Sequence, residues 1–314
     1  MKNLLLLVII LFPLLAYSQV SAFFGASGKN DVAQKIIYTS DGHYLVAGQV
    51  DNDASLYKFD CQGHLVDSLR FDLEAPLSYE QFFDVLELPD GEFVAVGSAD
   101  VLFAEPPVDM VVAMRVSANL EVLASDTFLV LHKRGEARSL LRTETGRYIL
   151  SGLVAGVGFD FGNVFSVTFD PVTLAPLDSI TVFSYGVDNL HHINLAANGD
   201  LLFAGGSVLG NIFDPESPLL HRTYVRRTKP DGSLVWDYTH DETFKNKLGR
   251  AYFSDAIENP ATGNIIAGGT RFTGDTVNAL DAQYLLFSPD GDSLDGHTLR
   301  CGRHYLQPSR RSQQ

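Results

Sequence analysis

The chain is poor in cysteine, tryptophan and positive charge. Among its 314 residues there are 2 cysteines and 1 tryptophan, and 23 Lys and Arg stand against 38 Asp and Glu. The formal net charge of −15 disfavours binding to nucleic acid phosphates or anionic lipid surfaces. The two cysteines, Cys61 and Cys301, are expected near opposite ends of the fold and therefore as free thiols.

Long apolar runs are missing after the N-terminus. Residues Met1 to Gln19 have the form of an export signal, with Lys2, an apolar run from Leu4 to Leu15, and a small and polar end. That run is too short for a membrane span of ~20 residues. We therefore expect export through the Sec pathway and a mature chain that is secreted or held on the outer cell surface, without a membrane span.

Helical periodicity is also missing, and a β-repeat takes its place. Five times the chain shows a turn residue, an apolar run that ends in glycine, and a second extended pair with its own turn. Each turn glycine precedes the core glycine at a nearly constant distance: 48−42, 97−91, 152−146 and 205−199 all equal 6, while 268−263 equals 5. The core glycines are Gly48, Gly97, Gly152, Gly205 and Gly268.

The distance between successive core glycines is long enough for one four-stranded antiparallel sheet, which is the blade of a β-propeller. Such a sheet cannot bury both faces alone, so the copies must close radially on one another. The sequence predicts an all-β fold with five recognisable blades, or a shortened six- to seven-bladed propeller. The expected organisation is a signal peptide over 1–19, one propeller over 20–300 with copies at about 31–71, 79–129, 136–183, 187–239 and 247–300, and a disordered tail over 301–314.

The second hairpin turn of each copy is expected at Gly63, Asn119, Thr173, Gly232 and Gly291. Glycine and asparagine supply the positive φ that tight hairpins need. In every copy a leucine follows this turn within three residues: Leu65, Leu120, Leu174, Leu234 and Leu294.

Several segments resemble the propeller repeats of secreted Bacteroidota surface proteins. Residues 24–33 read Phe-Gly-Ala-Ser-Gly-Lys-Asn-Asp-Val-Ala, followed by an Ile-x-x-Thr-x-Asp-Gly pattern up to Gly48. Lys229 to Trp236 is similar to the Lys-x-Asp-x-x-Gly hairpin of that family. The resemblance implies a repeat scaffold that is often cargo for type IX secretion, and its motifs are structural rather than catalytic.

The connections between the second and third strands, and between blades, lie on one face of the propeller and are the longer ones. Such loops are where binding residues usually lie. Aromatic rings beside carboxylates suit sugars, peptides or cationic groups. The predicted binding residues are Phe103, Phe159, Phe161, Phe213, Phe272, Asp51, Asp109, Asp160 and Asp214.

Metal binding has weak candidates. His191 and His192 lie near Asp188 close to the inner rim, but adjacent residues of a strand point to opposite faces, so both are not expected on one ion. Asp51 to Asp53 and Asp290 to Asp295 echo fragments of calcium loops without their ordered spacing. We expect no cofactor, with calcium as the alternative.

The expected function is a non-enzymatic module that binds an extracellular glycan or protein. A nucleophile elbow of the Gly-x-Ser-x-Gly type is missing, and one tryptophan excludes the quinone-cofactor propellers, whose blades repeat a docking tryptophan. Two alternatives stay open: a structural segment of a larger surface protein, or a polysaccharide hydrolase or lyase with acids among Asp51, Asp109, Asp160, Asp214 and Asp275.

Overall fold

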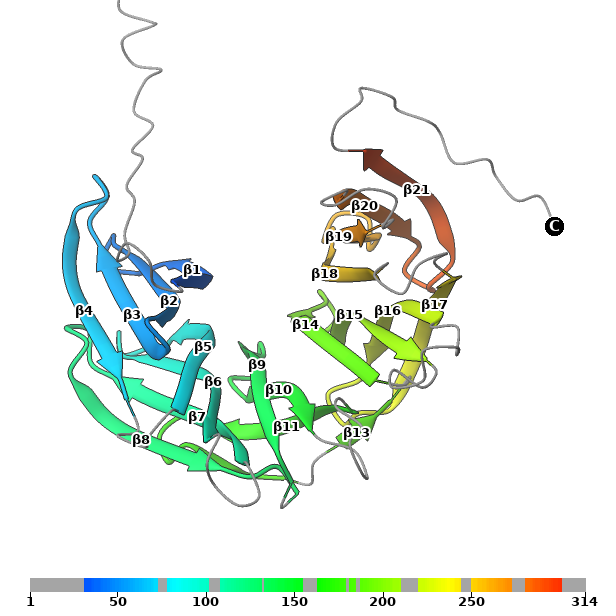
Figure 1. Ribbon diagram of the computed structural model, residues 1–314. Helices are drawn as coiled ribbons and strands as arrows, with labels where there is room; N and C mark the ends of the chain where they lie inside the picture. Colours follow the sequence, from blue (N-terminus) through cyan, green and yellow to red (C-terminus); the bar gives the residue numbers. More distant parts are fainter. Residues whose placement is uncertain are drawn as a thin grey trace, which may run out of the picture.

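The computed structural model describes residues 31–72, 78–101, 108–131, 133–154, 163–178, 181–184, 187–209, 220–243, 250–272 and 280–300. These residues form five antiparallel sheets, each built from consecutive strands in the order of the sequence. No helix occurs among them, and hence none that could cross a membrane. The sheets are arranged as an arc around a common centre, which is the architecture of a β-propeller (Figure 1).

The blades are named 1 to 5 in chain order. Blade 1 contains β1 (Val32–Tyr38), β2 (Tyr44–Val50), β3 (Asp53–Phe59) and β4 (Leu65–Phe71). Blade 2 contains β5 (Ser78–Glu87), β6 (Phe93–Val101), β7 (Val108–Val116) and β8 (Val122–Phe128). Blade 3 contains β9 (Gly135–Arg142), β10 (Tyr148–Val154), β11 (Asn163–Asp170), β12 (Ala175–Pro176) and β13 (Thr181–Phe183), the last two forming a split outer strand.

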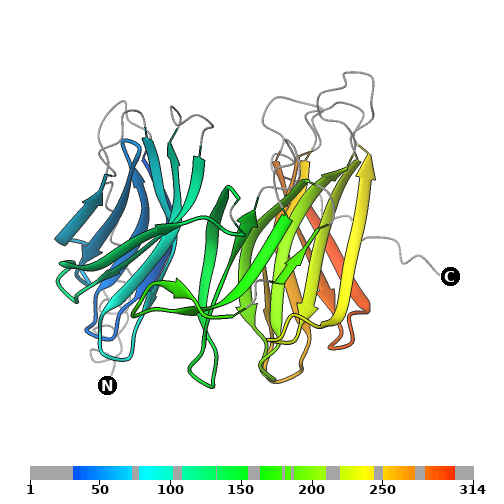
Figure 2. The same cartoon turned by 90° about the horizontal axis from the view of Figure 1, so that it is seen from below.

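Blade 4 contains β14 (Val187–Leu195), β15 (Leu201–Leu209), β16 (Leu220–Thr228) and β17 (Leu234–Thr243). Blade 5 contains β18 (Arg250–Glu258), β19 (Ile265–Phe272), β20 (Leu280–Phe287) and β21 (Ser293–Arg300). The first strand of each blade, β1, β5, β9, β14 or β18, lies nearest the centre of the arc (Figure 1). Seen from below, the strands of neighbouring blades stand side by side with their connections at the two ends (Figure 2).

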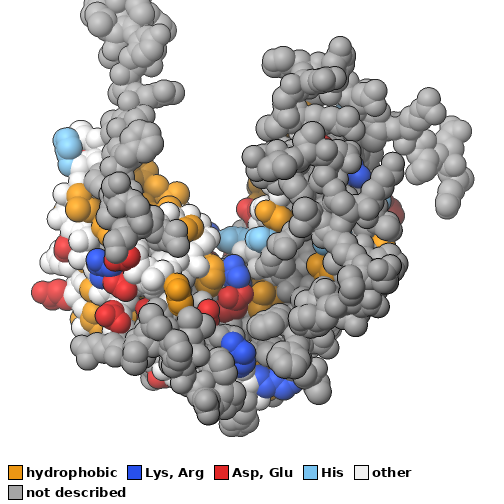
Figure 3. Space-filling model, in the orientation of Figure 1, with side chains coloured by type: hydrophobic (Ala, Val, Ile, Leu, Met, Phe, Trp, Pro, Cys, Tyr) orange, Lys and Arg blue, Asp and Glu red, His pale blue; other side chains and the backbone are white. Residues whose placement is uncertain are grey.

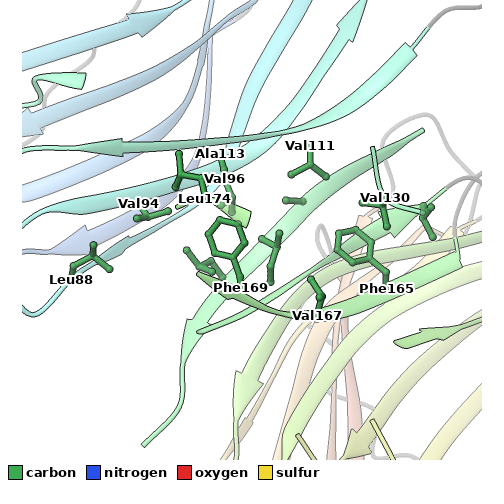
Figure 4. Packing of buried hydrophobic residues seen from close by; sticks show 14 residues of the cluster. Leu88, Val94, Val96, Val111, Ala113, Val130, Phe165, Val167, Phe169 and Leu174 are labelled. Atoms are coloured by element: carbon green, nitrogen blue, oxygen red, sulfur yellow. The ribbon is translucent and has the colours of Figure 1, made fainter. Parts of the chain in front are cut away.

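Apolar contacts between successive sheets form the core. Between blades 2 and 3, for example, Val94 and Val96 of β6 belong to the same buried cluster as Phe165, Val167 and Phe169 of β11 (Figure 4). Equivalent buried clusters join blades 1 and 2, blades 3 and 4, and blades 4 and 5. The second strands of blades 2 to 4 are therefore covered on both faces, which explains why their sequences are apolar without alternation.

The core glycines have a steric cause. The first strand of every blade carries a β-bulge opposite this position, and in blades 1 to 3 a backbone carbonyl at the bulge lies close to the glycine. A Cβ atom on Gly97 would lie 1.7 Å from the carbonyl oxygen of Gln81, and one on Gly152 would lie 1.9 Å from that of Glu136. Only glycine fits there.

The fifth core glycine differs from the prediction. Gly269 pairs with Phe253 at the bulge, and a Cβ atom there would lie 2.0 Å from the carbonyl oxygen of Tyr252. A Cβ atom on Gly268 would meet nothing within 4 Å. Gly269 is thus the equivalent residue, and because 269−263 equals 6, the spacing holds in all five blades.

The second hairpin turns differ in two blades. In blades 1, 4 and 5 a glycine has the positive φ, whereas in blades 2 and 3 it is Leu120 (φ 57°) and Leu174 (φ 58°), not Asn119 or Thr173. Both leucines are buried, at 4% and 1% exposure, while Leu65, Leu234 and Leu294 are about half exposed. The five leucines are therefore not equivalent. Burial of an apolar side chain compensates for a strained backbone at Leu120 and Leu174.

One predicted loop is a tight turn. The sequence predicts a longer connection between the second and third strands, but in blade 1 β2 continues to Val50 and β3 begins at Asp53. Asp51 (φ 54°) and Asn52 (φ 75°) form the two-residue connection with the positive φ values of a type I′ hairpin. Asp51 is therefore explained by turn geometry.

Candidate functional site

The centre of the arc is built from the same position of each blade. After the bulge in its first strand, each blade places one polar residue toward the centre: Lys35, Asp84, Ser139, His192 and Asp255. We call these five residues the inner ring. Figure 3 shows histidine, lysine and acidic side chains gathered at the middle of the arc.

Lys35 links blade 1 to two other blades. Its Nζ lies 3.4 Å from Oδ1 of Asp84 in blade 2 and 2.8 Å from Nε2 of His192 in blade 4. Because an ammonium group can only donate, Nε2 of His192 must accept, which places the ring proton on Nδ1. That Nδ1 lies 3.4 Å from Oδ1 of Asp255 in blade 5.

Asp84 is the most buried carboxylate of the inner ring, with 2% of its side chain exposed. Its Oδ2 accepts hydrogen bonds from the backbone N–H of Leu140, at 2.9 Å, and from the hydroxyl of Ser139, at 3.2 Å. Both donors belong to blade 3. Together with Lys35 they satisfy a charge that would otherwise be costly to bury.

Asp255 stays ionised at neutral pH. Burial raises the pKa of its carboxyl group, but the Nδ1–H group of His192, the backbone N–H of Ala256 and the charge of Lys35 more than compensate, and the net shift is downward. The amide of Asn194 in blade 4 also donates to Oδ1 of Asp255 at 2.5 Å. The inner ring therefore works as an interblade lock in which each charged group has a counterpart.

A second set of residues lies one position earlier in each first strand. The extra residues of the five bulges are Gln34, Phe83, Arg138, His191 and Ser254. We call them the bulge residues. Since the first strands begin at the connections between blades, the bulge residues lie on the side of the inner ring that faces the longer loops.

The bulge residues of blades 2 to 4 make aromatic and cationic contacts. The guanidinium of Arg138 lies 3.9 Å from the ring centroid of Phe83, and its Nε donates to Oε1 of Glu136 at 2.7 Å. The ring of His191 stacks on Tyr252 of blade 5, with centroids 4.4 Å apart. The side chains of all five bulge residues are at least partly exposed.

His191 is neutral at physiological pH. Burial lowers the pKa of its imidazole to about 4, and the nearby charge of Arg138 acts in the same direction. Nε2 of His191 is buried without a hydrogen-bond partner. His191 and His192 have different partners, because the bulge separates their side chains: His191 stacks on Tyr252, whereas His192 contacts Lys35 and Asp255.

In the described ranges, no three His, Cys, Asp or Glu side chains form a group that could hold a metal ion. His192 approaches Asp84 and Asp255, but the ammonium of Lys35 already supplies a positive charge among them. Asp188 lies in β14 opposite Ser207, and its side chain is outside the described set. Cys61 is free and exposed.

Most of the predicted binding residues fall outside the described residues: Phe103, Phe159, Phe161, Phe213, Asp160 and Asp214. Asp109 pairs with Asp100 at the start of β7, and Phe272 ends β19, but neither side chain is described. Of the predicted site residues, only His192 joins the inner ring and only His191 belongs to the bulge residues.

The other members of both sets were missed by sequence reasoning, although a signal exists. Each inner-ring residue precedes its core glycine by a nearly fixed distance: 48−35, 97−84, 152−139 and 205−192 equal 13, and 269−255 equals 14. The residue types differ at each copy, so only the spacing could have identified them.

No known family profile and no curated protein sequence matches the chain. Among solved structures it is similar to the Dos1 propeller (13% identity, TM-score 0.49, 84% of this chain and 59% of that chain). It also resembles an endo-arabinase from Bacteroides thetaiotaomicron (10%, 0.49, 90% and 98%) and a variant of the Synechocystis apocarotenoid oxygenase (11%, 0.50, 90% and 64%).

At these identities the likeness concerns the fold alone. The chain spans less than two thirds of the Dos1 and oxygenase chains. The class that the five radial sheets define is the β-propeller, a scaffold that carries many unrelated functions.

Proposed function

We propose that this chain is an exported, non-enzymatic binding module that holds an extracellular glycan or protein on the face of the longer connections. The observation that supports it is the contrast between the two sets at the centre. In the inner ring, contacts between blades hold Lys35, Asp84 and His192, whereas Phe83, Arg138, His191 and Tyr252 remain partly exposed on the side of the longer loops. Rings and planar polar groups in this arrangement suit sugars and peptide segments.

The inner-ring carboxylates do not support hydrolysis. Glycoside hydrolysis needs one carboxyl group with a raised pKa as general acid, beside a second carboxylate. The pKa of Asp255 is instead lowered, and Asp84 is held by Lys35 and by donors of blade 3. Asp84 and Asp255 instead hold neighbouring blades together.

The longer loops would extend this site. The connections at 102–107, 155–162, 210–219 and 273–279 contain or adjoin the predicted binding residues Phe103, Phe159, Phe213 and Phe272. Export and membership of the Bacteroidota repeat proteins belong to the same proposal. They are supported by Lys2 with the apolar run after it, and by the motifs around Gly48 and Trp236.

Retention on a glycan array and on immobilised surface proteins tests the proposal. The variants are Arg138→Gln and Tyr252→Ala at the centre, and Phe103→Ala, Phe159→Ala, Phe213→Ala and Phe272→Ala in the loops. Leu234→Ala and Leu294→Ala, half exposed on the opposite face, are matched controls. We expect at least one ligand to be lost by the first set and kept by the controls, with unchanged circular dichroism.

If every variant retains all ligands, the binding face is wrong. An activity screen against extracellular polysaccharides separates the rival enzyme. Cleavage that disappears in Asp109→Asn, Asp160→Asn, Asp214→Asn or Asp275→Asn, with folding intact, would establish a hydrolase or lyase in place of a binding module.

A further inference from the structure

The arc does not close. Blade 1 and blade 5 lie on opposite sides of an opening, and the space-filling view is hollowed between them (Figures 1 and 3). Each inner blade has two neighbours, whereas blades 1 and 5 have one each. The repeat therefore predicts one uncovered sheet face at each end of the arc. The equivalent residues of the other blades should be buried.

Ile36 lies on the uncovered face of blade 1. It stands directly after the inner-ring residue Lys35 and is 61% exposed. The equivalent residues of the other four blades are 1 to 4% exposed, because each packs on the preceding blade: Val85, Leu140, Ile193 and Ala256.

Ile266 lies on the uncovered face of blade 5. It stands three positions before the core glycine Gly269 and is 40% exposed. Its equivalents are 0 to 2% exposed, because each packs on the following blade: Leu45, Val94, Ile149 and Leu202.

These two residues belong to continuous apolar faces. On blade 1, Ile36 pairs with Val46, and the adjacent row runs from Tyr38 through Tyr44 to Phe59. Tyr38 and Tyr44 are 66% and 39% exposed.

On blade 5, Ile266 pairs with Ile257 and with Leu286, and Ile257 is 51% exposed. Monomeric proteins rarely expose contiguous apolar faces unless a partner covers them.

The inner ring also lacks an interblade contact at the opening between blades 5 and 1. At two junctions the inner-ring residue accepts a backbone N–H from the following blade, with Leu140 donating to Asp84 at 2.9 Å and Ile193 to Ser139 at 3.5 Å. Asp255 is the last member of the ring, and 51% of its side chain is exposed toward solvent. The missing neighbour would present a donor to it.

We propose that a β-sheet with two apolar faces, donated by a separate protein, inserts between blades 5 and 1 and continues the established blade-to-blade interface. A single inserted sheet covers both faces at once. At the four junctions between successive blades an apolar sheet face packs against another apolar sheet face, and the inserted sheet continues this chemistry. The insertion is independent of the ligand on the loop face.

Cysteine labelling with fluorescein maleimide tests the proposal in a Cys61→Ser, Cys301→Ser background of the secreted chain. In the purified protein, Ile36→Cys and Ile266→Cys should react at least roughly 100-fold faster than Val85→Cys, whose thiol is exposed only by local opening. Light scattering should show a monomer. Protection of both thiols in a monomer would mean that the arc closes on itself, and protection in a dimer would mean that a second copy fills the opening.

The second arm adds the surface and secreted proteins of the producing organism. We expect both cysteines to become protected and to crosslink to one and the same polypeptide, and Ile36→Asp or Ile266→Asp to abolish this. Thiols that stay reactive throughout would overturn the proposal. Loop variants such as Phe159→Ala should leave the protection unchanged, so a failure of the loop-face function is recognised separately.

Discussion

Nζ of Lys35 lies 2.8 Å from Nε2 of His192, although 157 residues separate them in the chain. The contact joins blade 1 to blade 4 across the centre of the arc. It means that the blades are held not only by apolar contacts between neighbours but also by a polar lock through the axis.

Removing the ammonium group of Lys35 should lower the free energy of unfolding, because the polar contacts at the axis are lost. Lys35→Met leaves Asp84 buried without its cation, and we expect a loss of about 2–4 kcal/mol in the free energy of unfolding. Urea denaturation measures it, with the exposed Lys229→Met as a control expected within about 0.5 kcal/mol. The lock is refuted if the two variants lose the same amount, or if adding Asp84→Asn to Lys35→Met recovers nothing.

His191 should make stability depend on pH. Its pKa is lowered from 6.5 to about 4 by burial, so between these values the unfolded chain binds a proton that the folded chain does not. The free energy of unfolding should therefore fall as pH decreases from 6.5 to 4, by up to about 3 kcal/mol.

The variant His191→Phe keeps an aromatic ring against Tyr252 and removes the titration. Thermal unfolding between pH 4 and 7 should show a flatter dependence for this variant than for the natural chain. Parallel curves would show that other groups cause the effect.

Gly268 and Gly269 should respond oppositely to the same substitution. A Cβ atom on Gly269 would lie 2.0 Å from the carbonyl oxygen of Tyr252, so Gly269→Ala must displace the bulge and should cost more than about 2 kcal/mol. Gly268→Ala meets open space and should be neutral or slightly stabilising, since alanine restricts the unfolded chain. Equal losses in chemical denaturation would contradict the assignment of Gly269 as the fifth core glycine.

Leu120 allows a test of strain against burial. At its φ of 57°, glycine is easier to accommodate than alanine, so Leu120→Gly should be more stable than Leu120→Ala by about 1 kcal/mol. Leu45 is equally buried but lies in a regular strand, and there the order should reverse. If alanine is the better replacement at both positions, the backbone of Leu120 is not strained.

Much of the fold follows from local signals. The recurring turn glycine and apolar run predict the blade, because a bulge carbonyl leaves room for no side chain at the core glycine and a doubly covered strand needs no polar face. The sequence also places most turns correctly. It fails at Leu120 and Leu174, where a long-range gain from burial overrides the local preference for glycine or asparagine.

The candidate site could not be recognised in this way. Lys35, Asp84 and Asp255 are ordinary charged residues in separate copies, and nothing nearby in the chain distinguishes them. They meet because radial packing brings one position of every first strand to the same axis, which no local pattern encodes.

What the amino-acid sequence determined by itself is the repeating unit, since backbone sterics and strand burial act within one blade. How many neighbours each blade has was decided only by the tertiary structure. The curvature of the arc results from side-chain packing between sheets, and that packing alone leaves Ile36 and Ile266 uncovered on either side of the opening.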